Sequence, residues 1–113
     1  MSNRITDLTF LQSFTGGNKD KMNKYIGIFL QMCPGQLDAM QSLLASANYD
    51  ALRATAHSLK PQITYMGIKS GEDLIKRIER HSAEKFEVEK LPQMLDEFNG
   101  VCNKAMVELK AAI

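Results

Sequence analysis

The apolar residues of this chain recur mainly at steps of three and four, the spacing that places side chains on one face of an α-helix. The first such segment predicts a short helix over Thr6–Phe14, with Leu8, Leu11 and Phe14 facing inward. The Gly-Gly-Asn sequence at 16–18 predicts a break, because glycine tolerates positive φ and asparagine caps a following helix. The chain should therefore begin with one short, separate helix.

A much longer apolar stripe begins near Lys19 and continues to Leu44. It contains Pro34, which removes one backbone hydrogen bond and clashes with the preceding turn. The stripe consists of Met22, Tyr25, Ile26, Phe29, Leu30, Cys33, Leu37, Met40 and Leu44. Because it keeps its phase across the proline, the pattern predicts one bent helix rather than two helices.

The same periodicity predicts three further helices. A seam beginning at Tyr49 steps alternately by three and four, and Gly67 then provides a stop. The sequence Ser70–Asp73 is typical of the cap of a fourth helix, and the polar stretch His81–Glu87 should link that helix to the last one. The last helix carries Pro92 in its first turn. Since the connections are short, we expect an all-α fold, an antiparallel four-helix bundle with a short extra N-terminal helix.

Composition and charge exclude several classes of protein. The 113 residues fit one domain, which we expect to span residues 1–113. Fourteen Lys and Arg against thirteen Asp and Glu give a net charge of +1, and Trp is absent, which argues against a nucleic-acid-binding protein. No apolar run approaches the ~20 residues of a membrane span, and the N-terminus has no signal-peptide core. We therefore expect a cytoplasmic protein that binds neither nucleic acid nor membrane.

Of the two histidines, His57 has the more distinctive surroundings. At about 100° per residue it lies roughly 130° from the centre of the third helix's seam, so its ring should face solvent. Lys60 lies one turn after it and Arg53 one turn before it. An imidazole beside cations is a poor metal site, but it is a reasonable nucleophile for a phosphoryl group. An ordinary solvated histidine is the alternative, and His81 is expected to be a helix-end cation.

One stretch of the third helix resembles the signature of histidine-containing phosphotransfer (HPt) domains. The matching residues are His57, Leu59, Lys60 and Gly67. The resemblance extends over about residues 5–112, through Leu11, the Gly-Gly-Asn element, Phe29 and Pro34. Pro61 departs from the family pattern, which usually has glycine at that position.

The resemblance implies a phosphorelay carrier without kinase activity of its own. His57 would accept a phosphoryl group from the aspartate of a receiver domain and pass it to another receiver, and Lys60 would stabilise the phosphoryl charge. The implied partners are receiver domains of response regulators and hybrid histidine kinases, which would also supply Mg²⁺. The chain would then need no cofactor or metal, and we expect a monomer. The implied docking surface consists of Arg53, Ala54, Pro61 and Thr64.

The residues leave three other functions to be tested. A dimerisation fragment of a sensor kinase has an acidic residue after its histidine and proline five residues on, whereas here Ser58 follows and Pro61 is four residues on. A helical scaffold could bind receivers or other helices without being phosphorylated. A metal or redox enzyme is disfavoured because Cys33 and Cys102 form no CxxC motif and lie on apolar stripes, where core packing is expected.

Overall fold

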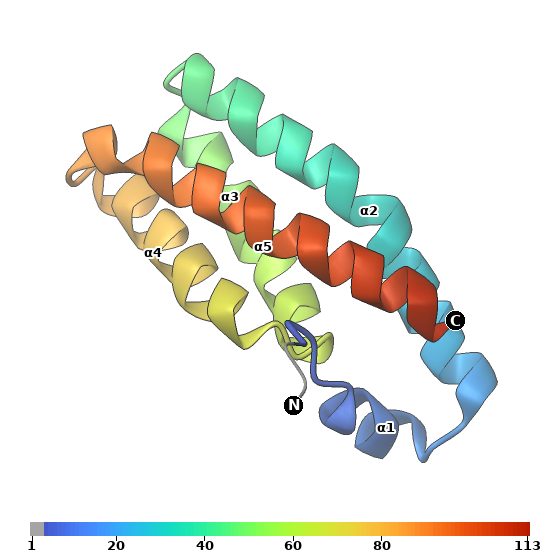
Figure 1. The fold of residues 1–113 in the computed structure, drawn as a ribbon. Coiled ribbons are helices and arrows are strands. Elements are labelled where there is room, and N and C mark those ends of the chain that lie inside the picture. Colours follow the sequence, from blue (N-terminus) through green and yellow to red (C-terminus); the bar gives the residue numbers. More distant parts are fainter. Residues whose placement is uncertain (1–3) are drawn as a thin grey trace.

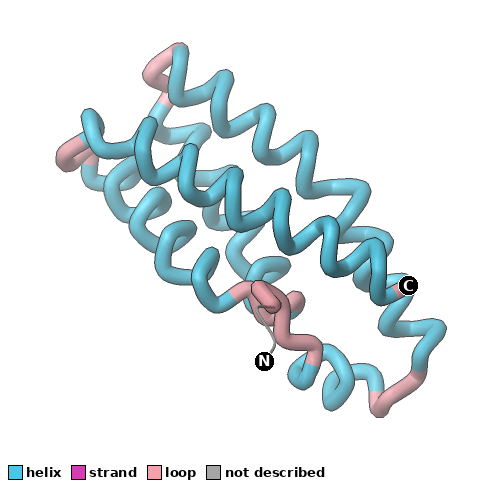
Figure 2. The backbone as a smooth tube through the Cα atoms, viewed as in Figure 1, coloured by secondary structure: helices cyan, strands magenta, loops and turns pink. Residues whose placement is uncertain are grey.

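The computed structural model describes residues 4–113, which fold into a helical bundle (Figure 1). Its elements in chain order are α1 (Thr9–Thr15), α2 (Lys19–Ala45), α3 (Tyr49–Tyr65), α4 (Lys69–Glu84), the 3₁₀ helix η1 (Val88–Lys90) and α5 (Leu91–Ala112). Short loops join the long helices, and consecutive long helices run antiparallel (Figure 2). The predicted four-helix bundle with a short N-terminal helix is confirmed.

An apolar core fills the space between the four long helices. The predicted seam of α3 is completely buried along Leu52, Ala56, Leu59 and Ile63. Cys33 of α2 and Cys102 of α5 are also buried and hydrogen-bonded to each other, and this contact together with burial raises the pKa of the Cys102 thiol. Both cysteines are therefore core residues, as predicted from their positions on apolar stripes.

All three prolines of the chain lie within helices. α2 continues through Pro34 as one helix, and Pro92 lies in the first turn of α5. Pro61 lies inside α3, which also continues through it. Asn18 caps α2 as predicted, since its side-chain oxygen accepts a hydrogen bond from the Lys21 amide at 3.0 Å. Within residues 4–113, no helix has both the length and the apolar character that a membrane span requires.

The N-terminal helix begins three residues later than predicted. The backbone amides of Ile5 and Thr6 donate to the carboxylate of Glu108 on α5, at 2.7 and 3.0 Å, and the Thr6 hydroxyl donates to it at 2.9 Å. Partial burial raises the pKa of Glu108, but these bonds outweigh it and hold the pKa below its usual value. Because Glu108 holds this segment outside a helix, α1 starts only at Thr9.

The short helix α1 buries Leu11 but not Phe14. Leu11 and Thr15, four residues apart, form its buried face, and Leu8 packs against the core just before it. Phe14 instead lies beside Phe10 on the exposed face. The prediction that Phe14 faces inward is therefore wrong, because its ring packs on Tyr25 of α2 and Tyr65 of α3 at the surface instead of entering the core.

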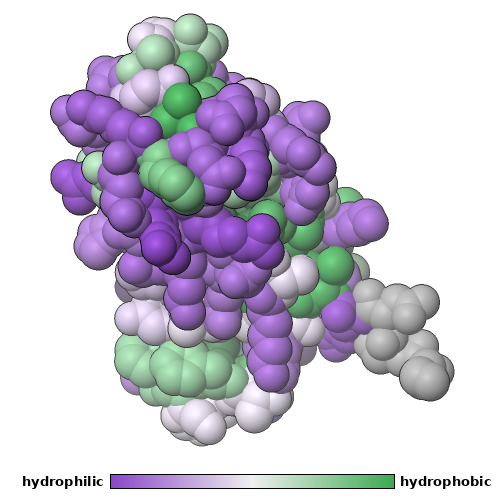
Figure 3. Space-filling model, turned by 90° about the vertical axis from the view of Figure 1, so that its left-hand side faces the viewer, coloured by the Kyte–Doolittle hydropathy of each residue, from purple (hydrophilic) through white to green (hydrophobic). Residues whose placement is uncertain are grey.

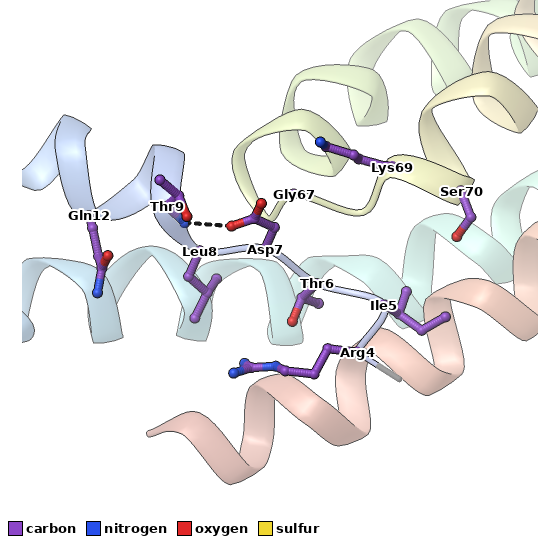
Figure 4. A pocket seen from close by; sticks show the side chains of 10 residues that line it. All are labelled: Arg4, Ile5, Thr6, Asp7, Leu8, Thr9, Gln12, Gly67, Lys69 and Ser70. Atoms are coloured by element: carbon purple, nitrogen blue, oxygen red, sulfur yellow. Dashed lines mark hydrogen bonds between the residues drawn. The ribbon is translucent and has the colours of Figure 1, made fainter. Parts of the chain in front are cut away.

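The N-terminal segment crosses the turn between α3 and α4 at Gly67 (Figure 4). The Asp7 amide donates to the Gly67 carbonyl at 3.1 Å, and the Asp7 side chain accepts from the Thr9 amide at 3.0 Å. Gly67 has a φ of 63°, and a Cβ at this position would lie 1.9 Å from the Asp7 carbonyl oxygen. Gly67 therefore follows the end of α3, as predicted, and also leaves space for the segment that crosses it.

The start of α4 also differs from the prediction. The helix begins at Lys69, so Ser70–Asp73 lie inside the helix rather than in its cap. Its N-cap position is the buried Ile68, whose carbonyl accepts from the amides of Gly71 and Glu72 at 2.9 and 3.0 Å. The tight turn at Gly67 brings the chain directly into α4, and this moves the start of the helix forward.

The end of α4 lies inside the polar stretch His81–Glu87 that was predicted to be a linker. The helix continues to Glu84, and only the residues after it form the turn. Ser82 is completely buried, and its hydroxyl donates to the Ile78 carbonyl at 2.7 Å. Because this bond satisfies the hydroxyl within the helix, a polar residue can extend the buried face by another turn.

Candidate functional site

The exposed face of α3 carries His57, as its distance from the buried seam predicts. The His57 side chain is 65% exposed, although its neighbours Ala56 and Leu59 are completely buried. The helix is anchored at its start by Asn48, whose side-chain oxygen accepts from the Ala51 amide at 3.2 Å. His81, by contrast, lies in the last turn of α4.

A carboxylate from α4 completes a cluster around the imidazole. Glu79 Oε2 lies 2.6 Å from His57 Nδ1, and Glu79 Oε1 lies 2.7 Å from Lys60 Nζ. The Glu79 side chain is mostly buried against α3, with 18% of its surface exposed. One carboxylate therefore connects the imidazole and the ammonium that the sequence singled out.

Glu79 decides which imidazole nitrogen carries the proton. Partial burial raises the pKa of Glu79, but the hydrogen bonds and charges of Lys60 and His57 outweigh it and hold the pKa below its usual value. The carboxylate is thus ionised at neutral pH and can only accept, so His57 Nδ1 is the donor. In the neutral ring, the lone pair is then on Nε2.

The predicted docking residues surround His57 on α3. Arg53, Ala54, Pro61 and Thr64 are all exposed, so the structure brings the four onto one accessible helix face. Lys60 is partly exposed, at 32%, and Glu79 holds its ammonium close to α4. Pro61 has no amide proton, so the His57 carbonyl lacks its usual bond within the helix.

Glu79 is the residue of this cluster that the sequence analysis missed. The available signal was the register of the two antiparallel helices: His57 lies 10 residues before Gly67, and Glu79 lies 12 residues after it. Residues at similar distances from a tight turn lie opposite each other in such a pair. Glu79 also directly follows the buried Ile78, which places it at the edge of the apolar face of α4.

Residues 24–109 match the family model of the Hpt domain. The chain belongs to the Hpt domain family. Hpt domains are phosphotransfer domains of phosphorelays, and they interact with receiver domains. The match therefore confirms that the chain is a member of the family that the sequence around His57 resembles.

The fold of this Hpt domain is similar to a solved structure. It superimposes on the crystal structure of histidine-containing phosphotransfer protein B (HptB) from Pseudomonas aeruginosa PAO1 with a TM-score of 0.87. The sequences are 21% identical, and the match covers 98% of this chain and 96% of the other. None of the curated proteins compared with this Hpt domain matches it. The structural likeness thus supports the five-helix fold independently of the sequence signature.

Proposed function

We propose that this Hpt domain is a phosphorelay intermediate in which His57 accepts a phosphoryl group from a receiver-domain aspartate and passes it to another receiver. The hydrogen bond between Glu79 and His57 is the observation that supports this most strongly, because it leaves Nε2 as the basic nitrogen of an exposed ring. A scaffold that only binds its partners has no need to orient an imidazole in this way. The receivers of response regulators and hybrid histidine kinases are the proposed partners, and the exchange would take place in the cytoplasm.

The transfer step requires no proton to leave the ring. The Nε2 lone pair attacks phosphorus, the bond between phosphorus and the aspartate oxygen breaks, and its electron pair returns to the receiver's carboxylate. The ring keeps its Nδ1 proton and becomes a cation, which the Glu79 carboxylate stabilises through the bond it already makes. The same atoms would serve the reverse step, and the receiver would supply the Mg²⁺ that neutralises charge on the phosphoryl oxygens.

Lys60 is the cation that shares the Glu79 carboxylate with His57. Its ammonium is bonded to Glu79 in the unphosphorylated domain, and a turn of its flexible side chain would bring it to the phosphoryl oxygens. We expect Lys60→Ala to slow transfer about tenfold, or ~1.4 kcal/mol, as measured by rapid-quench transfer from a phosphorylated receiver. Lys104→Ala, which removes an exposed cation from α5, is the control. If both variants transfer at the wild-type rate, Lys60 has no role in the step.

Glu79→Ala should slow transfer about tenfold for a different reason, the loss of imidazole orientation. The diagnostic measurement is the tautomer of His57 by ¹⁵N NMR, because the proton should move from Nδ1 toward Nε2 in the variant. Glu84→Ala removes a carboxylate from the exposed end of α4 and should change neither tautomer nor rate. An unchanged His57 tautomer in Glu79→Ala would contradict the proposed role of Glu79.

The direct test of the function is to mix the wild-type domain with a phosphorylated receiver domain. Acid-labile label should pass to the Hpt domain, whereas ATP alone should leave it unlabelled. Labelling by ATP alone would instead identify a kinase fragment. Binding of the receiver without any transfer of label would favour the scaffold.

A further inference from the structure

The two cysteines of the chain form a pair in the core that the phosphotransfer site does not use. Cys33 of α2 and Cys102 of α5 are completely buried, and their thiols are hydrogen-bonded to each other where the two helices pack together. The face of the molecule in Figure 3 is covered mostly by hydrophilic side chains, and neither thiol reaches the surface. The fold therefore brings together two sulfur atoms that are far apart in the sequence.

The hydrogen bond between the thiols makes them unequal. It lowers the pKa of Cys33, against the effect of burial, and it raises the pKa of Cys102, to which burial also contributes. Cys33 is therefore the thiol that ionises first, and the thiolate is the nucleophilic form of a cysteine. Cys102 lies in contact with it, in the position of a second thiol that can resolve an oxidised sulfur.

A hollow between α2 and α5 lies beside the pair. Its volume is about 210 Å³, and its lining includes Pro34, which directly follows Cys33 in the chain. Asn99 and Asn103, which lie on either side of Cys102 along α5, also line it. The Asn99 side-chain oxygen is buried and has no hydrogen-bond partner in the part of the chain that the structure describes, so it is available to accept from a small hydroxylic molecule. The hollow is therefore an entrance large and polar enough for a small hydroperoxide.

Pro34 weakens α2 next to Cys33. Because proline has no amide hydrogen, the Leu30 carbonyl lacks its usual bond within the helix. A helix opens locally more readily where such a bond is missing, and Leu30 and Pro34 lie on either side of the cysteine in the chain. Local opening at this point would connect the hollow with a thiol that complete burial otherwise protects.

We propose that Cys33 and Cys102 are a modification site, at which a hydroperoxide oxidises the two thiols to a disulfide that joins α2 to α5. The Cys33 thiolate attacks the peroxide, the O–O bond breaks, and Cys33 becomes a sulfenic acid while the other oxygen leaves as hydroxide. The Cys102 thiolate then attacks that sulfur, the S–O bond breaks, and a second hydroxide leaves. The protons released by the two thiols convert both hydroxides to water. Two thiols thus lose two electrons and form one disulfide, and one hydrogen peroxide is reduced to two molecules of water.

The disulfide should change the stability of the domain and not its phosphotransfer. It closes a loop that contains all of α3 and α4, and such a cross-link stabilises a protein mainly by restricting the unfolded chain. We expect the midpoint of thermal unfolding, followed by circular dichroism, to rise by about 10 °C in the oxidised domain. The oxidation requires neither His57 nor a receiver, so His57→Gln should form the disulfide as readily as wild type.

The test is to incubate the folded wild-type domain with hydrogen peroxide, block the remaining thiols with iodoacetamide and map the tryptic peptides by mass. We expect the peptide of residues 25–53 to be linked to that of residues 91–104, and the link to be lost on reduction with dithiothreitol. Peptide mapping also separates this product from methionine sulfoxide, which adds one oxygen at each site. Cys102→Ala is the control, which should give no linked peptide and a dimedone adduct on Cys33. Alanine leaves no unpaired hydroxyl in the core, and circular dichroism checks that the variant is folded.

Two free thiols in peroxide-treated wild type would overturn the modification site, as would sulfinic or sulfonic acid on either cysteine without a linked peptide. A dimedone adduct that forms on Cys102 in Cys33→Ala as fast as on Cys33 in Cys102→Ala would overturn the assignment of Cys33 as the nucleophile. Pro34→Ala restores the missing helix bond and should slow the oxidation about threefold. An unchanged rate in Pro34→Ala would overturn the entrance beside that proline.

Discussion

His57→Gln is expected to abolish phosphoryl transfer, lowering the rate by more than about 1000-fold. Glutamine is close to histidine in size and polarity and would occupy the same exposed position on α3, so the fold should be unaffected. Its amide nitrogen has no available lone pair, because that pair is delocalised into the carbonyl. No nucleophile then remains at the position that Nε2 occupies. The measurement is acid-labile label on the domain after incubation with a phosphorylated receiver.

The chain contains a matched control for this variant, since its second histidine is His81. His81→Gln should transfer phosphate at the wild-type rate, because the His81 ring lies at the end of α4, with Nδ1 2.6 Å from the Phe86 carbonyl oxygen. Label that persists on His57→Gln but disappears from His81→Gln would reverse the assignment of the acceptor. Receiver binding should persist in His57→Gln, because the surrounding docking surface is intact.

Leu59→Ala should reduce the free energy of unfolding by about 2–5 kcal/mol. Leu59 is completely buried between the helices, although it lies only two residues from the exposed His57. Truncation removes apolar contacts and leaves a cavity that the packed helices can close only in part. Urea denaturation followed by circular dichroism measures the change.

Ser58→Ala provides the reference for this measurement, because Ser58 lies between His57 and Leu59 on the exposed face of α3. Its stability should change by no more than about 0.5 kcal/mol. The folded fraction of Leu59→Ala should still transfer phosphate, since the substitution leaves Glu79 and His57 in place. If Leu59→Ala is as stable as wild type, the helix packing described for α3 is incorrect.

The predictions from the sequence that proved accurate depend on neighbours within a few turns of helix. The three-and-four spacing places Leu59 inward and His57 outward whichever helix packs against α3, because both positions follow from 3.6 residues per turn. Asn18 as a cap and Gly67 as a stop are similarly local, since each depends on the backbone of its own turn. Local geometry therefore explains the agreement in helix number, order and burial.

The inaccurate predictions concern residues whose partners are distant in sequence. Ile5 and Thr6 leave the predicted helix because Glu108, at the other end of the chain, accepts their amide hydrogens. Phe14 faces outward because its ring partners are Tyr25 and Tyr65, on two other helices. A helical wheel contains no information about these partners, so the pattern of a single segment could not have predicted them.

The same distinction applies to the candidate site. The sequence alone determined that His57 is exposed and that Lys60 lies one turn away, because both positions belong to one helix. The contact between α3 and α4 adds that Glu79 holds both side chains, and the proton is assigned to Nδ1 because an ionised carboxylate can only accept. That bond depends on the register between α3 and α4, which is set by the tight turn at Gly67 and by the packing of their buried faces. The nucleophilic nitrogen is thus chosen by a contact between helices, which no periodicity within one helix can specify.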